Sequence, residues 1–380
     1  VARYGLHFHR TGVAEDPHEV TGAVVKHSPG WGVVNHGSHA DVYDSITYWA
    51  DGAGFVAEAG KERGSFKRCF ALRSEGAQNT GRRYNDRKTW DITLDGKELH
   101  PPIHEVDFGH KGEGFWLQGG GVAVDDCVAA GHANYAIVLW AEPLEGDMPA
   151  GLAKEDGMVD RDGPIDPHNL PLKSFSNNTV FASAGGFDYG FTLPLGESVV
   201  ETFTVYNIRP VIDIDSRNYP AVTNYLLGSY GNCCIAERYA KHLRVENPQF
   251  CNVDGKDGGH GIRRNYDAHD PVGVYGGVME GLNVGVQVAV HAENEDVEGV
   301  RFHDNRVDIN HPKGTVDGSS VSHLDIYPGT SVGFWWHVEA NAKPADSGFE
   351  EGTGLHTFTV PGEYEFEFAR ENTTGTITVS

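Results

Sequence analysis

The sequence predicts an all-β protein, a right-handed parallel β-helix followed by a small antiparallel β-sandwich. Gly accounts for 49 of the 380 residues without a Gly-X-Y period, which excludes collagen and indicates a chain that turns often. Short runs rich in Val, Ile, Thr, Tyr and Phe recur at intervals of about ten residues, with Gly or Asn between them. Helical periodicity is nearly absent and is weak even in Pro220 to Val245, the one segment where a longer helix is plausible.

The runs within residues 1–315 favour a stacked coil. They are short and are joined by single turns such as His36 to His39. An antiparallel sandwich also places strands at this spacing. Short runs with single turns, however, are typical of successive sides of a solenoid. We therefore expect Val42 to Tyr48 and Phe66 to Leu72 to be parallel neighbours or near-neighbours in one stack of strands.

The tail, residues 319–380, has a different pattern. Tyr and Phe alternate strictly with Glu from Glu363 to Phe368, which predicts a half-buried antiparallel strand. The segment around it resembles the closing hairpin of a PKD-type, immunoglobulin-like module. A cupredoxin ends similarly, but a type 1 copper site needs a Cys ligand, and none follows Cys251. The expected core of this sandwich consists of Trp335, Phe358, Tyr364 and Phe366.

Charge and composition limit the partners and the location. The 54 acidic and 30 basic residues give a net charge of −24, which excludes a broad nucleic-acid-binding surface. Acids spread along the chain, with Lys scarcer than Arg, favour a halophilic source, and an ordinary acidic secreted protein is the alternative. No apolar stretch approaches the ~20 residues of a membrane span. The chain begins without Met or signal-peptide features, so we expect an extracellular or cell-surface protein whose signal and upstream domains are missing here.

Three ordered motifs carry a family resemblance. Arg3 to His9 reads R-Y-G-L-H-F-H, close to R-Y-P-I-H-F-H, and Gly52 to Gly60 is similar to a G-H-C-F-F-x-E-D-G motif. Pro171 to Asn178 is similar to P-L-G-K-F-Y-N-N. Over roughly residues 3–290 the chain thus resembles the β-helical region of the cell-migration-inducing hyaluronidase family. The resemblance implies a β-helix that acts on an acidic, uronate-containing polysaccharide.

Five histidines gather near the beginning of the chain: His7, His9, His27, His36 and His39. Alternate residues of a strand face the same side, so His7 and His9 should project together. Two such imidazoles can share a divalent metal, and either can act as an acid or base near neutral pH. We expect His7 and His9 to be metal ligands, His9 also to be catalytic, and calcium or zinc to be the candidate cofactor. A row of satisfied polar or surface histidines is the alternative.

Glu58 and Glu62 are the candidate catalytic acids. Glycoside hydrolysis normally uses two carboxylic acids, and this pair lies at the end of one predicted strand and in the turn after it. Two departures from the family pattern lie beside them, because Ala53 and Ala59 stand where the family has His and Asp. A pair of solvated turn acids is the alternative interpretation.

A basic stretch follows these acids. Between Lys61 and Lys88 there are nine basic residues and three acids, against the trend of the whole chain. Arg side chains bind carboxylated sugars well, and aromatic faces stack on sugar rings. A solvated loop that pairs with neighbouring acids would give the same composition. The expected substrate-binding residues are Arg3, His36, Lys61, Arg63, Arg82 and Trp116.

Three functions remain open from the sequence. A hydrolase would use Glu58 and Glu62, with His7, His9 and His36 binding a metal or positioning the sugar. A polysaccharide lyase or epimerase would use a His or Arg to abstract the proton next to a uronate carboxylate. A non-catalytic glycan-binding or adhesive surface protein is the third alternative, and the two alanine departures favour it. The oligomeric state is not predicted.

Overall fold

A computed structural model describes most of the β-helical chain. The described residues are 4–12, 16–76, 92–94, 97–99, 109–140, 159–160, 163–164, 170–190, 198–208, 212–215, 223–227, 230–231, 235–237, 242–252, 259–264, 272–287, 294–311, 321–334, 355–368 and 373–380. All regular elements in these ranges are strands, so the described part of the chain contains no helix that could cross a membrane. The chain divides into two compact units, Val1–Gly196 and Glu197–Ser380.

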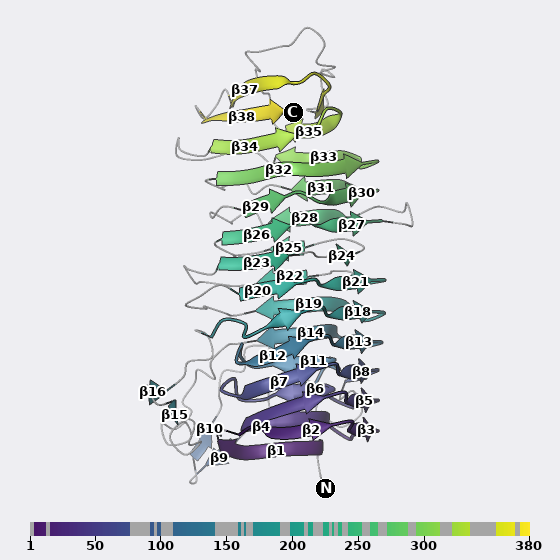
Figure 1. The fold of residues 1–380 in the computed structure, drawn as a ribbon, viewed down its shortest axis with the longest axis vertical. Helices are drawn as coiled ribbons and strands as arrows, with labels where there is room; N and C mark the ends of the chain where they lie inside the picture. The colour runs from purple at the N-terminus through teal and green to yellow at the C-terminus, as the bar shows by residue number, and fades with distance from the viewer. Residues whose placement is uncertain are drawn as a thin grey trace. The chain divides into compact units, whose positions relative to one another are not determined.

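The first unit is a parallel β-solenoid whose strands stack in three ladders (Figure 1). Ladder A contains β1 (Tyr4–Gly12), β4 (Trp31–Tyr43), β6 (Phe55–Ala57), β11 (Phe115–Leu117), β14 (Tyr135–Trp140) and β19 (Gly185–Gly190). Ladder B contains β2 (His18–Thr21), the second half of β4, β7 (Arg63–Lys67), β12 (Val122–Asp125) and β17 (Phe175–Ser176). Ladder C contains β3 (Val24–Lys26), β5 (Ile46–Tyr48), β8 (Phe70–Leu72), β13 (Val128–Ala130) and β18 (Thr179–Phe181). One strand from each ladder makes one coil.

The register confirms the solenoid prediction. Val42 lies opposite Phe66 in ladder B, and Tyr48 lies opposite Leu72 in ladder C, both in parallel pairs. Two short antiparallel pairs add to the first unit: β9 (Ile92–Leu94) with β10 (Lys97–Leu99), and β15 (Val159–Asp160) with β16 (Gly163–Pro164).

Aromatic rings fill the interior of the first unit. Phe55 and Phe115 lie opposite each other in neighbouring strands of ladder A, and their rings stack with centroids 5.0 Å apart. The ring of Phe66, from ladder B, lies 5.4 Å from that of Phe55. All three side chains have no exposed surface. Since a buried Phe removes a large apolar area from water, this column is a main source of the unit's stability.

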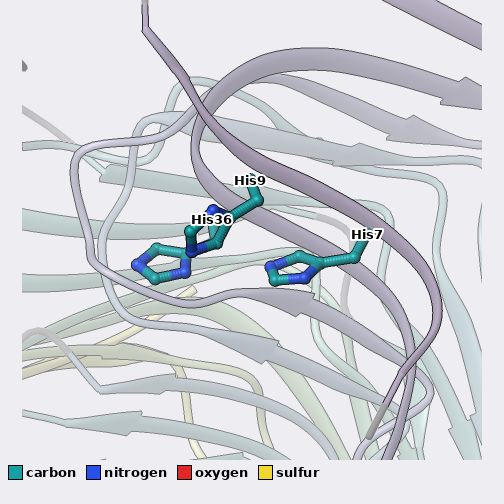
Figure 2. A group of neighbouring side chains, drawn as sticks. All are labelled: His7, His9 and His36. Atoms are coloured by element: carbon teal, nitrogen blue, oxygen red, sulfur yellow. The ribbon is translucent and has the colours of Figure 1, made fainter. Parts of the chain in front are cut away.

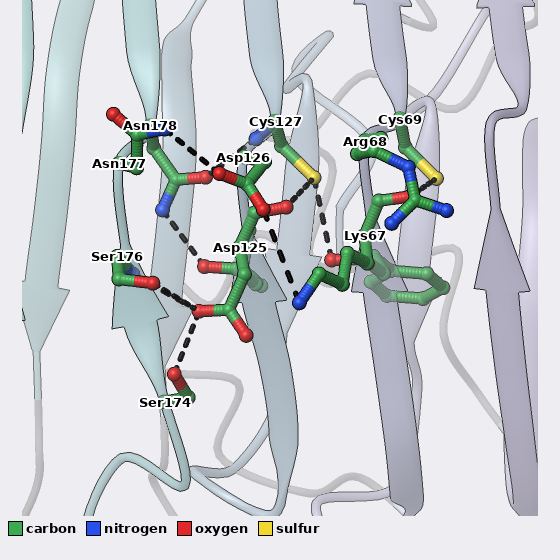
Figure 3. A network of polar contacts seen from close by, with 12 residues as sticks. Lys67, Arg68, Cys69, Asp125, Asp126, Cys127, Ser174, Ser176, Asn177 and Asn178 are labelled. Carbon is green, nitrogen blue, oxygen red and sulfur yellow. Dashed lines mark hydrogen bonds and ion pairs between the residues drawn. The ribbon is translucent and has the colours of Figure 1, made fainter.

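Polar side chains join successive coils at the turns between ladders B and C (Figure 3). The Oδ1 atom of Asp125 accepts hydrogen bonds from the hydroxyls of Ser174, at 2.6 Å, and Ser176, at 2.8 Å. The side-chain oxygen of Asn178 accepts one from the backbone amide of Cys127, at 2.9 Å. Backbone groups that a turn leaves without a strand partner are thereby satisfied by the next coil, as buried groups must be.

The second unit also consists of three parallel ladders (Figure 1). The first contains β20 (Ser198–Glu201), β23 (Thr223–Leu227), β26 (His242–Glu246), β29 (Val272–Tyr275), β32 (Asn294–His303), β34 (Val321–Ile326) and β38 (Thr373–Val379). The second contains β21 (Thr204–Tyr206), β24 (Tyr230–Gly231), β27 (Gln249–Cys251), β30 (Val278–Glu280) and the end of β32. The third contains β22 (Ile212–Asp215), β25 (Ile235–Glu237), β28 (His260–Arg264), β31 (Val284–Gln287), β33 (Val307–His311) and β35 (Thr330–Phe334).

The weak helical periodicity of Pro220 to Val245 was misleading, because its described residues form β23 to β26.

The separate C-terminal sandwich is not confirmed. β34 and β35 continue the parallel ladders through β32 and β33. The antiparallel pairs at this end are β36 (Leu355–Phe358) with β35, and β37 (Gly362–Phe368) with β38. Of the expected core, Phe358 is buried and Tyr364 is half-buried, whereas Trp335 and the side chain of Phe366 lie outside the described residues. A domain boundary between residues 315 and 319 stays a prediction.

Candidate functional site

The candidate site lies on the outside of the first coils, where ladder A turns into ladder B. His7 and His9 are in β1, and the register of β1 with β4 places His9 opposite His36. Glu58 directly follows β6, the next strand of ladder A, and its backbone amide bonds to the β4 carbonyl that precedes His36. Parallel stacking of the three coils therefore brings together residues far apart in the sequence.

Three imidazole rings form a compact cluster (Figure 2). The ring centroids of His7 and His9 are 4.9 Å apart, those of His9 and His36 are 5.0 Å apart, and those of His7 and His36 are 5.9 Å apart. One ring nitrogen from each residue lies within 4.8 Å of the others. His9 is exposed, whereas His7 and His36 are half-buried, so the cluster faces solvent through His9.

Glu58 joins the cluster through His36. Its Oε2 atom lies 3.1 Å from Nδ1 of His36, and their side chains are 25% and 15% exposed. A carboxylate at this distance orients an imidazole and stabilises its protonated form. His36 thus links His9, whose ring centroid lies 5.0 Å from its own, to the Glu58 carboxylate.

Glu62 is buried, whereas an acid–base pair with Glu58 would need both carboxyl groups to reach the substrate. It is 1% exposed, and its Oε1 atom accepts hydrogen bonds from the backbone amides of Gly37, at 2.9 Å, and Ala59, at 2.7 Å. Burial raises the pKa of Glu62, and the backbone hydrogen bonds oppose that shift. Because Gly37 and Ala59 directly follow His36 and Glu58, this buried carboxyl fixes the backbone beside both site residues. We assign Glu62 as a positioning residue.

Comparison with known families agrees with this fold. The family model described as CEMIP beta-helix matches residues 1–187, which include the whole site. Residues 1–187 are therefore similar to the β-helix of the CEMIP family. The resemblance read from the sequence is thereby confirmed over residues 1–187, and this match supports a hyaluronidase-like β-helix protein. Among curated proteins, none matches this chain.

Of the two alanines that depart from the family motif, only Ala59 adjoins the site. Ala53 has no exposed surface and packs in an apolar cluster with Trp31 and Val56. Ala59 follows Glu58, and its backbone amide binds Glu62. In this chain, neither position supplies a side chain that could carry a proton or bind a metal.

The structure does not bring every expected residue to the site. Trp116 is 1% exposed within the same apolar cluster, so its ring face offers no surface on which a sugar could stack. That expectation is wrong because the outer face of ladder A is covered at this position. Lys61 lies in the turn after Glu58, and Arg63 begins β7, so both lie close to the site in the chain. Arg3 and Arg82 lie outside the described residues.

The described cations of the basic stretch are largely paired. Arg68 makes two hydrogen bonds to the carboxylate of Asp44, at 2.7 and 2.9 Å. Arg73 pairs with Glu75 at 3.1 Å. Ion pairs of this exposed kind contribute little to stability, and their cations are less available to a polysaccharide.

Two other histidines of the sequence cluster lie elsewhere. His27 follows β3 in ladder C, and its ring contacts that of Trp49, with centroids 5.1 Å apart. His39 lies in ladder B opposite Arg63. This separation could not be predicted from residue spacing, because it depends on which ladder each residue occupies.

Proposed function

We propose that this protein is an extracellular or cell-surface carbohydrate-active β-helix that acts on an acidic, uronate-containing polysaccharide. The observation that carries the proposal is the half-buried His36–Glu58 pair, 3.1 Å apart, beside the exposed His9 in a region that matches a hyaluronidase-like family. A site at a corner shared by successive coils would suit a long polymer better than a closed pocket does.

The chemistry follows from the pair. The Glu58 carboxylate holds the His36 imidazole in one orientation, and the imidazole can then pass a proton to a glycosidic oxygen or take one from water. His9 is next to it and is exposed, so it lies where a bound sugar would reach. Lys61 and Arg63 are the cations best placed in the chain to meet the substrate carboxylates.

A lyase or epimerase is the second candidate. The burial of Glu62 leaves the site with an imidazole and one accessible carboxylate in place of the two carboxylic acids of most glycoside hydrolases. An imidazole is a suitable base for removing the proton next to a uronate carboxylate.

The test is incubation of the purified chain with hyaluronan, with other uronate polysaccharides and with a neutral glucan as control. Size-exclusion chromatography measures chain length, and ultraviolet absorbance detects unsaturated uronate ends. Shortening of an acidic polymer without such ends supports hydrolysis, and shortening with them supports the lyase. Retention on an immobilised glycan without any shortening would contradict catalysis and favour an adhesive protein.

A further inference from the structure

The three-histidine cluster has an unsatisfied atom at its centre. Nε2 of His7 is buried and has no hydrogen-bond partner among the described residues. Figure 2 shows the outer edge of the His7 ring turned toward His9 and His36. A buried polar atom without a partner is unfavourable, so such atoms in native proteins call for an explanation.

We propose that His7, His9 and His36 together bind one divalent transition-metal ion, with zinc the ion that their chemistry fits best. The sequence pattern indicated only His7 and His9, and the coil register adds His36 as the third ligand. Three protein ligands with an open fourth position for water are the arrangement of catalytic zinc sites.

The donor set selects the class of metal. Calcium takes six to eight oxygen ligands, whereas imidazole nitrogen suits zinc and its neighbours in the first transition row. Of the two ions considered from the sequence, the cluster therefore favours zinc. Three neutral imidazoles do not balance the charge of a divalent cation. The carboxylate of Glu58, next to His36, supplies negative charge near it.

The geometry needs only a small adjustment. Zn–N bonds of about 2.0–2.1 Å in a tetrahedral site place ligand nitrogens about 3.3 Å apart. The three nitrogens already lie within 4.8 Å of one another, so side-chain rotations on fixed strands can close the site. The exposed His9 would leave a bound metal a path to solvent.

The test needs no polysaccharide. It also distinguishes metal binding from proton transfer by His36, because a ring that contacts Glu58 through Nδ1 and a metal through Nε2 has no nitrogen left to carry a proton to a sugar. The chain is incubated with zinc, dialysed against metal-free buffer and analysed for bound zinc by mass spectrometry. We expect about one zinc per chain and a higher unfolding temperature with zinc present, because a ligand that binds only the folded state stabilises it. Replacing zinc by Co²⁺ should give the visible absorption of a tetrahedral nitrogen site.

Three single variants and one matched control decide the assignment. H7Q, H9Q and H36Q should each lose the retained zinc and the zinc-dependent rise in unfolding temperature. H27Q removes an exposed histidine outside the cluster and should keep both. Equal zinc retention by the wild type and all three cluster variants would overturn the proposal, as would a wild-type chain that retains no zinc. The unfolding temperature without zinc shows in the same experiment whether each variant is folded.

Discussion

Replacing Glu62 tests whether this buried carboxyl positions the site. In E62A the backbone amides of Gly37 and Ala59 lose their acceptor at a place that water does not reach. Each unpaired buried donor costs about 1–3 kcal/mol, so E62A should lower the free energy of unfolding by about 2–6 kcal/mol. E62Q keeps an acceptor oxygen in the same place and removes an ionisable group whose burial is unfavourable, so it should stay within about 1 kcal/mol of the wild type.

The assay is urea unfolding of the wild type, E62A and E62Q, followed by circular dichroism and compared at equal slope. Activity on the polysaccharide provides a second measurement, because loosened backbone at His36 and Glu58 should lower the activity of E62A at temperatures where it is still folded. E62Q should retain that activity. A stability of E62A within 0.5 kcal/mol of the wild type would refute the argument, and so would an E62Q variant that loses activity while remaining as stable as the wild type.

Three further predictions concern the first unit. Burial lowers the pKa of His132 to about 4, and its Nδ1 already accepts a hydrogen bond from the Ser74 amide, so protonation is disfavoured in the folded state. The contribution of His132 to stability should therefore be complete above the ordinary His pKa of about 6.5 and fall by up to about 3 kcal/mol as the pH drops toward 4. H132Q should flatten this pH dependence. Urea unfolding of both proteins between about pH 4 and 7 measures it, and the same pH dependence in H132Q as in the wild type would contradict the prediction. F115A should cost about 3–5 kcal/mol in the same assay because it opens a cavity in the aromatic column, and a cost below 1 kcal/mol would place Phe115 outside the core. Gly64 has a φ of +117°, and an added Cβ would lie 1.9 Å from the carbonyl oxygen of Ala40, so G64A should destabilise more than any exposed Gly→Ala change, with thermal unfolding as the measurement.

The sequence predicted those parts of the site that depend on local pattern. Alternation along a strand placed His7 and His9 on one face, and the structure brings their rings together. The meeting of His9 with His36 and of His36 with Glu58 depends on the register between coils of unequal length, which single-strand periodicity does not contain. The family motifs, which occur in the family's order along the chain, indicated only indirectly that these residues belong to one region.

Burial was the property that the sequence conveyed least. Glu and Trp often carry function, yet Glu62 and Trp116 are both buried. Glu62 is enclosed by the turn that it stabilises, and Trp116 packs in the outer apolar cluster of ladder A. The alternation from Glu363 to Phe368 correctly predicted an antiparallel strand, since β37 pairs with β38 in that sense. It could not show that β38 would also pair in parallel with β34.

The most direct test of the central claim is the chain length of hyaluronan after incubation with the wild type and two matched variants, E58Q and E246Q. Both changes remove one carboxylate charge, but Glu58 contacts His36 at the site, whereas Glu246 pairs with Arg244 in the second unit. The account predicts that the wild type and E246Q shorten the polymer equally and that E58Q, folded to the same extent, shortens it at least ten times more slowly. Equal shortening by all three proteins would contradict the assignment of the site to His36 and Glu58.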